Sequence, residues 1–162
     1  MISIVVLSLL LAVPQQDSPW TGLRFVVGAW TGEGGGGPGQ GSGEFSFRFD
    51  LQGKVLVRKN VSRYPATGQK PASTHEDLMV LYSESGRIRA DYYDSEDHVI
   101  RYEVTAAPGS VIFLSDAAPS QPRYRLTYTA LGPNRLAIKF EIAPPGKPDS
   151  FGVYIEAMAR RK

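Results

Sequence analysis

Two histidines are the only imidazole side chains in this chain, and each lies among acidic residues beside a strand-like run. His75 stands in "STHEDLMV", and His98 stands in "DYYDSEDHVIRYEV". Histidine beside carboxylates can form an acid–base pair or a metal site, or it can be an ordinary hydrogen-bonded rim residue. Glu96 and Asp97 next to His98 are typical of a turn.

The composition and the motifs of the chain exclude several other kinds of functional site. The chain has no cysteine, which excludes disulfides, thiolate metal sites and cysteine nucleophiles. It contains no nucleophile elbow, zinc-helix motif or spacing of paired catalytic carboxylates, so we predict neither a catalytic residue nor a metal ligand set. A net charge of +2 and the lack of basic runs with interleaved aromatics disfavour nucleic acid as a partner.

The elements that must position these residues are strands. From Gly28 onward, short runs alternate apolar and polar residues and are broken by Gly, Pro, Asn and Asp, which is the period of antiparallel strands. We predict an all-β fold, a single antiparallel up-and-down barrel of about ten strands. The predicted strands lie near residues 28–33, 43–51, 53–63, 74–83, 86–93, 98–105, 109–115, 122–130, 134–143 and 150–160.

The predicted connections alternate between two kinds. "LQGK", "SESGR", "TAAPGS" and "LGPN" are tight, whereas most of the others are longer. One end of the barrel is therefore expected to be tight and the other loop-rich, and binding is expected at the loops. The tract "GEGGGGPGQGSGE" is predicted to be a flexible hairpin loop, since no phosphate-loop motif follows. In "SPWTGLRFVVG" we expect a short helix, capped by Ser18 with Pro19 in its first turn, that plugs the tight end.

Strict alternation assigns the faces of the strands. The third strand is predicted to point Val55, Val57 and Val61 inward, and the fourth Leu78, Val80 and Tyr82. Four polar residues also fall on the predicted inward face: Lys59, Thr74, Glu76 and His98. His75 is predicted to point outward, so that a metal shared by the two histidines is not expected.

A barrel of about ten strands is wider than its own side chains fill, so we expect a cavity lined with apolar side chains and tyrosines. Lys59 and Glu76 lie on adjacent predicted strands. They are expected to form either a structural ion pair or the polar anchor of a ligand. The predicted ligand-binding residues are Lys59, Glu76, Tyr92, His98, Tyr102, Tyr128 and Phe140.

The first residues have a different character from the rest. The apolar run 2–13 is too short to span a bilayer comfortably and fits the core of a secretory signal, so no stable membrane span is expected. The alternative is a buried first strand or helix. We therefore divide the chain into a leader, 1–16, and a barrel domain, 17–162. The protein is periplasmic or secreted if the leader is cleaved and cytoplasmic otherwise.

A family resemblance begins at Gly28-Ala29-Trp30. A Gly-x-Trp on the first strand and an arginine at the end of the last, Arg160 or its neighbour Arg161, resemble the calycin superfamily of lipocalins, fatty-acid-binding proteins and nitrobindin-like barrels. The resemblance implies that Trp30 closes the barrel floor and that the arginine lies across its ring. "THEDLMVLYSESGRIRADYYDSEDHVIRYEV", "YRLTY" and "FEIAPPG" resemble bacterial, often secreted barrels similar to the nitrobindin-like group, over nearly all of the chain after Gly28.

Three functions follow as expectations. The first is non-enzymatic binding of a small, largely apolar molecule, outside the cytoplasm. The second, implied by the resemblance alone, is a haem barrel with nitric oxide or peroxide chemistry. Nitrobindins hold haem through a histidine late in the barrel, and this chain has none after His98, so Tyr128 or Tyr154 would have to replace it. The third is a filled barrel that serves as an interaction domain.

Overall fold

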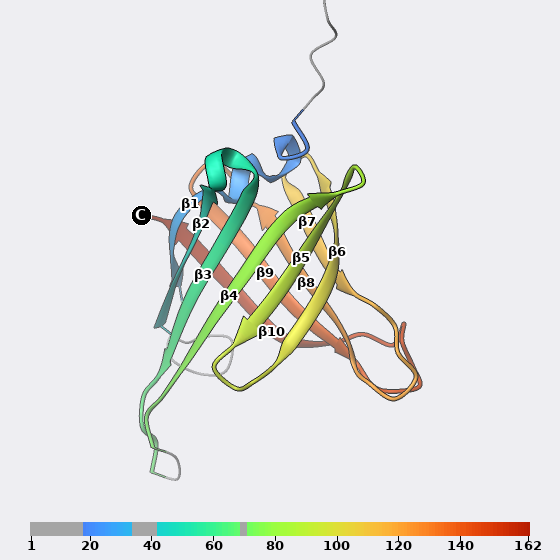
Figure 1. The fold of residues 1–162 in the computed structure, drawn as a ribbon. Helices are drawn as coiled ribbons and strands as arrows, with labels where there is room; N and C mark the ends of the chain where they lie inside the picture. The colour runs from blue at the N-terminus through green and yellow to red at the C-terminus, as the bar shows by residue number, and fades with distance from the viewer. Residues whose placement is uncertain (1–17, 34–41, 69–70) are drawn as a thin grey trace, which may run out of the picture.

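Ten antiparallel strands form a closed barrel in the computed structural model, which describes residues 18–33, 42–68 and 71–162. The strands follow chain order around the barrel, and β10 closes it against β1 (Figure 1). They are β1 Gly28–Glu33, β2 Ser42–Asp50, β3 Val55–Tyr64, β4 Ser73–Glu84, β5 Arg87–Asp94, β6 Val99–Ala107, β7 Ser110–Ser115, β8 Arg123–Ala130, β9 Arg135–Ala143 and β10 Gly152–Arg161. The predicted all-β, up-and-down barrel is confirmed. The predicted leader, 1–16, and the centre of the glycine tract, 34–41, lie outside the described residues.

The two ends of the barrel differ as the connections predict. At one end, which we call the tight-turn end, β4 and β5 are joined by Ser85 and Gly86, with φ of 50° and 78°. Positive φ at both central positions is what a two-residue hairpin turn of type I′ requires. The longer connections lie together at the opposite, loop-rich end (Figure 1).

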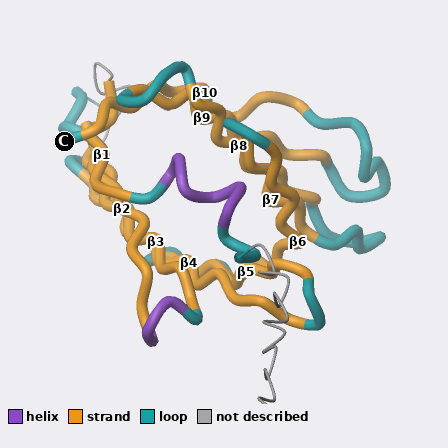
Figure 2. Tube along the Cα trace, turned by 90° about the horizontal axis from the view of Figure 1, so that it is seen from above, coloured by secondary structure: helices purple, strands orange, loops and turns teal. Residues whose placement is uncertain are grey.

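The expected N-terminal helix is a single 3-10 turn, η1, at Thr21–Val26. Its cap position is Trp20 and not Ser18, and no side chain caps it. Leu23 and Val26 are fully buried, and viewed along the barrel η1 lies within the ring of strands (Figure 2). No helix in the described ranges is long and apolar enough to cross a membrane.

An aromatic cluster fills the tight-turn half. Trp30 stacks on Phe45 with ring centroids 6.2 Å apart, and Tyr128 meets Phe47 edge-on at 5.5 Å and Phe113 at 6.1 Å. Four of these five rings are fully buried, and Phe45 is nearly so. Large aromatics packed in this way contribute much of the hydrophobic stabilisation of a small domain.

The Gly-x-Trp pattern meets an arginine at this end. The Cζ of Arg161 lies 4.2 Å from the centre of the Trp30 ring, which is cation–π geometry. Of the two arginines that the sequence offered, Arg161 makes this contact, whereas Arg160 is exposed. Gly28 has a φ of +132°, and a Cβ there would collide with Nη1 of Arg161. Gly28 therefore gives the guanidinium room to approach the backbone.

The face assignment fails on β3 and correspondingly on β4. Leu56 and Arg58 are buried on β3, and Arg58 lies opposite the inward Phe47. Lys59 is exposed, so its predicted inward position was wrong. The segment "VLV" at the start of β3 is apolar at consecutive positions. Its pattern therefore does not show which face of the strand is inward.

On β4 the inward residues include Met79 and Leu81, both fully buried. Leu78 and Val80 instead form part of the outer wall, and Glu76 is exposed there, contrary to the prediction. Lys59 and Glu76 both face outward on adjacent strands, and no ion pair joins them.

Candidate functional site

The inward side chains of the loop-rich half keep part of their surface accessible. In a closed barrel such side chains reach solvent through the open end, so the lumen is accessible from the loops. One side of this half is apolar: Tyr124 and Phe140 stack with ring centroids 5.9 Å apart, and Tyr154 meets Phe140 edge-on at 6.2 Å. Further half-buried members of this apolar wall are Ile100, Ile138 and Ile155.

A polar wall on β3, β4 and β5 completes the site. Arg58 donates a hydrogen bond to Asp77 in an ion pair that is about nine-tenths buried on both sides. The side-chain amide of Asn60 donates to the second oxygen of Asp77 at 2.9 Å. The carboxylate of Asp77 is thereby held by two neighbours on the adjacent strand.

The two histidines belong to one network. His75 was predicted to point outward, but its Nε2 lies 3.2 Å from the hydroxyl of Tyr92 inside the barrel. Tyr92 donates to Asp94 at 3.2 Å, and Nδ1 of His98 lies 2.9 Å from the same carboxylate oxygen. The Nδ1 of His75 is 3.3 Å from Glu96 at the rim. Hydrogen bonds through Tyr92 and Asp94 therefore link the two histidines.

Burial, charge and hydrogen bonds shift the pKa of two members of this network, Tyr92 and Asp94. Burial, followed by the charges of Asp77 and Asp94, raises the pKa of Tyr92 well above its usual range, so its hydroxyl stays a donor. Burial opposes the charge of Asp94, yet hydrogen bonds from His98 and the backbone of Glu96 outweigh it and lower the pKa of Asp94. Asp94 is consequently a carboxylate at neutral pH.

Two polar atoms remain without a hydrogen bond at the floor of the site. They are Nε of Arg58 and the hydroxyl of Tyr128, both buried; the two side chains lie near each other, but neither atom has a hydrogen bond of good geometry among the described residues. Burial would lower the pKa of Arg58, but Asp77 outweighs it and raises the pKa, so the guanidinium is charged. Burial raises the pKa of Tyr128. Buried groups of this kind cost free energy unless a further partner satisfies them.

The predicted ligand-binding residues fall into three groups. Tyr92 and Phe140 line the open half, while Tyr102 and Tyr128 are buried beneath it. His98 lies at the mouth, with 57 % of its side chain exposed. The remaining two, Lys59 and Glu76, face away from the lumen.

Sequence reasoning missed four luminal residues: Arg58, Asn60, His75 and Asp77. The runs "RKN" at 58–60 and "THED" at 74–77 are polar at every position, so alternation alone does not separate the inward residues from the outward ones. The face was instead assigned from the apolar residues Val57, Val61, Leu78 and Val80, which lie on the outer wall.

With its two histidines counted as neutral, the polar wall has a slightly negative net charge. Asp77 and Asp94 contribute two carboxylates, whereas Arg58 is the one guanidinium that faces them in the described part of the lumen. Such a wall favours hydrogen-bond donors and cations over anions. No group of three or more His, Asp or Glu side chains is arranged to hold a metal ion within the described ranges.

Fold and site together define a closed, ten-stranded antiparallel barrel whose lumen is packed at one end and amphipathic at the other. This architecture is consistent with a calycin-like barrel. No protein-family model matches the chain, and a search of curated proteins gave no match.

Proposed function

We propose that the protein binds a small, largely apolar molecule with a neutral or cationic polar head in the loop-rich half of the barrel, without catalysis. One observation carries the proposal: a half-buried aromatic and aliphatic wall stands opposite a hydrogen-bonding wall of slightly negative charge in the same open half. Pockets for small molecules combine these two features, an apolar lining and a few fixed polar groups.

The apolar part of the ligand would lie against Tyr124, Phe140 and Ile138. Covering these half-exposed side chains stabilises the complex by about 25 cal/mol for each Å² of apolar surface removed from water. The head would meet Tyr92 and His75, whose hydrogen bonds already fix their positions. Because these protein side chains are already held in place, they lose less conformational entropy when the ligand binds.

The calycin resemblance supports the same function. The contact of Arg161 with Trp30, and the room that Gly28 gives it, match what that resemblance implies for the closed end. We extend the proposal to membership of a calycin-like, secreted group of barrels and to a location outside the cytoplasm, which rests on the leader sequence.

A haem barrel has less support, because the residues present do not fit the cofactor. The late strands carry no histidine, and Tyr128 is buried between Phe47 and Phe113 with its hydroxyl toward Arg58. Tyr154 is 65 % exposed at the loop-rich edge.

Fluorescence titration with 1-aminoanthracene, an apolar ring system with an amine head, tests the proposal. We expect saturable binding to the wild-type protein, and at least fivefold weaker binding to Phe140→Ala, because that ring forms part of the apolar wall. Phe151→Ala is the matched control, since its ring packs over Arg125 on the outer wall. Anthracene-2-carboxylate should bind more weakly than the amine. Equal binding to both variants, or preference for the carboxylate, would refute the proposal.

A further inference from the structure

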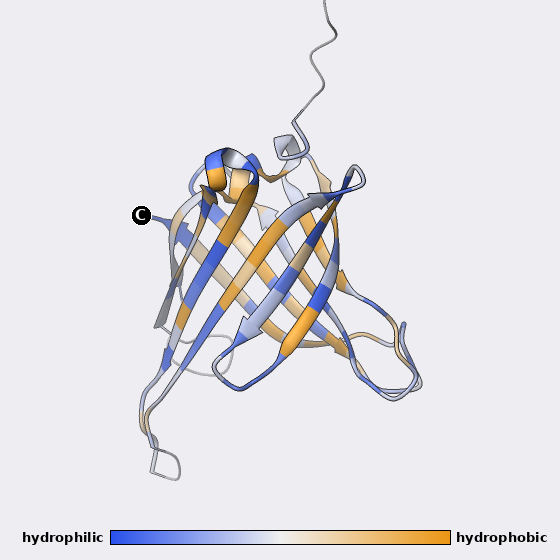
Figure 3. Cartoon of the chain, in the orientation of Figure 1, coloured by the Kyte–Doolittle hydropathy of each residue, from blue (hydrophilic) through white to orange (hydrophobic). Residues whose placement is uncertain are grey.

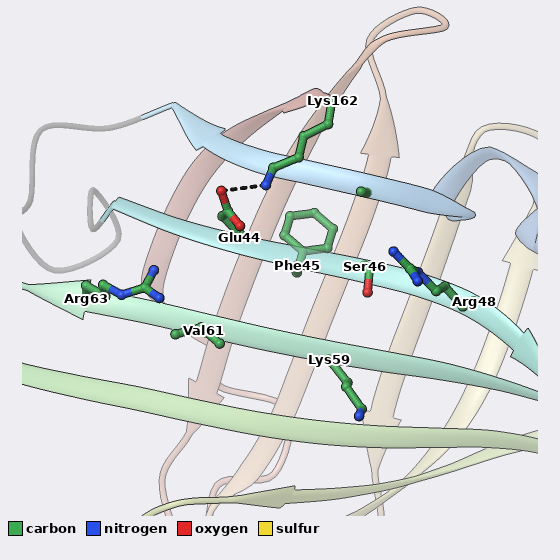
Figure 4. Close-up of a pocket in the computed structure, with 9 residues that line it drawn as sticks. Glu44, Phe45, Ser46, Arg48, Lys59, Val61, Arg63 and Lys162 are labelled. Carbon is green, nitrogen blue, oxygen red and sulfur yellow. Dashed lines mark ion pairs between the residues drawn. The ribbon is translucent and has the colours of Figure 1, made fainter.

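A groove of about 240 Å³ lies on the outer wall of the barrel, away from the lumen, over β1, β2 and β3 (Figure 4). The small side chains of Ala29 and Ser46, paired in register on adjacent strands, leave it shallow and open. Its charged lining residues are Glu44, Arg48, Lys59, Arg63 and Lys162.

The groove is strongly cationic. Lys162 forms an ion pair with Glu44, drawn in Figure 4, and this hydrogen bond and charge lower the pKa of Glu44. Within the described ranges, no carboxylate lies within ion-pair distance of Arg48, Lys59 or Arg63. One acid is thus neutralised and three cations face solvent.

The cations are spread along the groove and are not focused on one point. Lys59 and Arg63 are four residues apart on the outer face of β3, which corresponds to about 13 Å along a strand. Figure 4 shows Arg63 and Arg48 toward opposite ends. This spacing suits several anionic groups side by side better than one bound oxyanion.

An apolar strip continues from the groove across the same wall. In register, Lys59 lies beside Leu78, then Tyr93 on β5 and Val99 on β6. Tyr93 is 43 % and Val99 is 62 % exposed. In the hydropathy colouring, the hydrophilic middle of β3 lies beside the hydrophobic middle of β4, and the start of β6, beyond β5, is hydrophobic as well (Figure 3).

We infer that this wall, defined by Arg48, Lys59, Arg63, Tyr93 and Val99, docks on an anionic lipid surface. The cations would face lipid phosphates and carboxylates, and the tyrosine and valine would enter the interface between head groups and acyl chains. A lipid surface fits better than a soluble anion because it offers negative charge and an apolar layer together. The inference is independent of the ligand proposed for the lumen.

Co-sedimentation with vesicles tests the charged half of the surface. We expect binding to phosphatidylcholine vesicles that contain about 30 % phosphatidylserine and none to phosphatidylcholine alone. Arg48→Gln/Lys59→Gln/Arg63→Gln should bind at least tenfold more weakly. Lys54→Gln/Arg87→Gln/Lys147→Gln removes the same charge outside the groove and should bind within about twofold of wild type. Equal losses in the two triple variants would overturn the inference, because net charge alone would then explain binding.

The apolar half needs its own variant. Tyr93→Ser/Val99→Ser should weaken vesicle binding severalfold and make the remainder more sensitive to salt. Unchanged binding, or displacement of the protein from vesicles by millimolar inorganic phosphate, would point to a soluble anion site and would overturn the lipid surface. All variants should keep the wild-type affinity for 1-aminoanthracene, which separates this test from that of the lumen.

Discussion

The tight-turn half and the loop-rich half of the barrel are built from the same strands, but their inward side chains are packed differently. Trp30, Phe47 and Phe113 are fully buried in the first half, whereas Tyr124 and Phe140 in the second are only half-buried. Polar inward side chains gather in the loop-rich half, where hydrogen bonds join them. One half therefore supplies most of the stability, and the other keeps a partly exposed surface that a ligand can cover.

This division explains how one sheet can hold both a core and a site. Each strand runs from the packed end to the open end, so the packed aromatics fix the position of the side chains farther along. The cost is a set of polar groups inside a barrel, including the buried Arg58. The following variants measure how unequal the two halves are.

The largest contrast is expected between two aromatic truncations. Trp30→Ala should lower the free energy of unfolding by about 3–5 kcal/mol, the usual range for a fully buried large aromatic. Phe140→Ala should cost about 1–2 kcal/mol, because its ring is already half-exposed. Urea unfolding measures both, and equal losses would remove the distinction between the halves.

The buried ion pair gives the next effect. Asp77→Asn should cost about 3 kcal/mol, since it leaves the Arg58 guanidinium buried without its counter-charge. The double variant Arg58→Met/Asp77→Leu should regain most of this loss. Asp149→Asn is the control, because its partner Arg123 binds it at the surface, and it should cost under about 0.5 kcal/mol. A double variant no more stable than Asp77→Asn would contradict the account.

A smaller contrast separates the two adjacent arginines. Arg161→Met should cost about 1–2 kcal/mol, because its guanidinium stacks on Trp30 and donates to the carbonyls of Val27 and Phe25. Arg160→Met should be neutral within about 0.5 kcal/mol. Thermal unfolding of the pair distinguishes them, and a larger loss for Arg160→Met than for Arg161→Met would contradict the stabilising contact of Arg161 with Trp30.

The smallest effect is a pH dependence of the loop-rich half. The pKa of Asp94 is lowered in the folded state, so the unfolded chain takes up this proton more readily. The resulting stability is present above about pH 4 and is lost as the pH falls below it. Asp94→Asn should therefore lose under about 1 kcal/mol at pH 6 and progressively less toward pH 3. The loss caused by Trp30→Ala should not change over that range, and a constant Asp94→Asn effect would contradict the assignment.

The architecture was accessible from the sequence. The strands were predicted close to their observed bounds, because turns such as Ser85-Gly86 interrupt short alternating runs. The alternation of tight and longer connections also gave the two ends correctly. These are local signals, set by turn chemistry and by the period of a strand.

The site was only partly accessible. The runs "VLV" and "LMVLY" are apolar at consecutive positions, so they do not tell which face of β3 or β4 is inward. The assignment put Lys59 and Glu76 in the lumen and left out Arg58 and Asp77. Only the register between the two strands shows that these last two meet, and register depends on the whole barrel.

Nuclear magnetic resonance of the amide and indole N–H groups during titration with 1-aminoanthracene tests the central claim most directly. The account predicts shifts for Asn60, Tyr92 and Phe140, and none for the Trp30 indole, which donates to the carbonyl of Val26 at 2.8 Å in the packed half. Shifts confined to the Trp30 indole or to the outer groove around Arg48, with the loop-rich lumen unmoved, would contradict it.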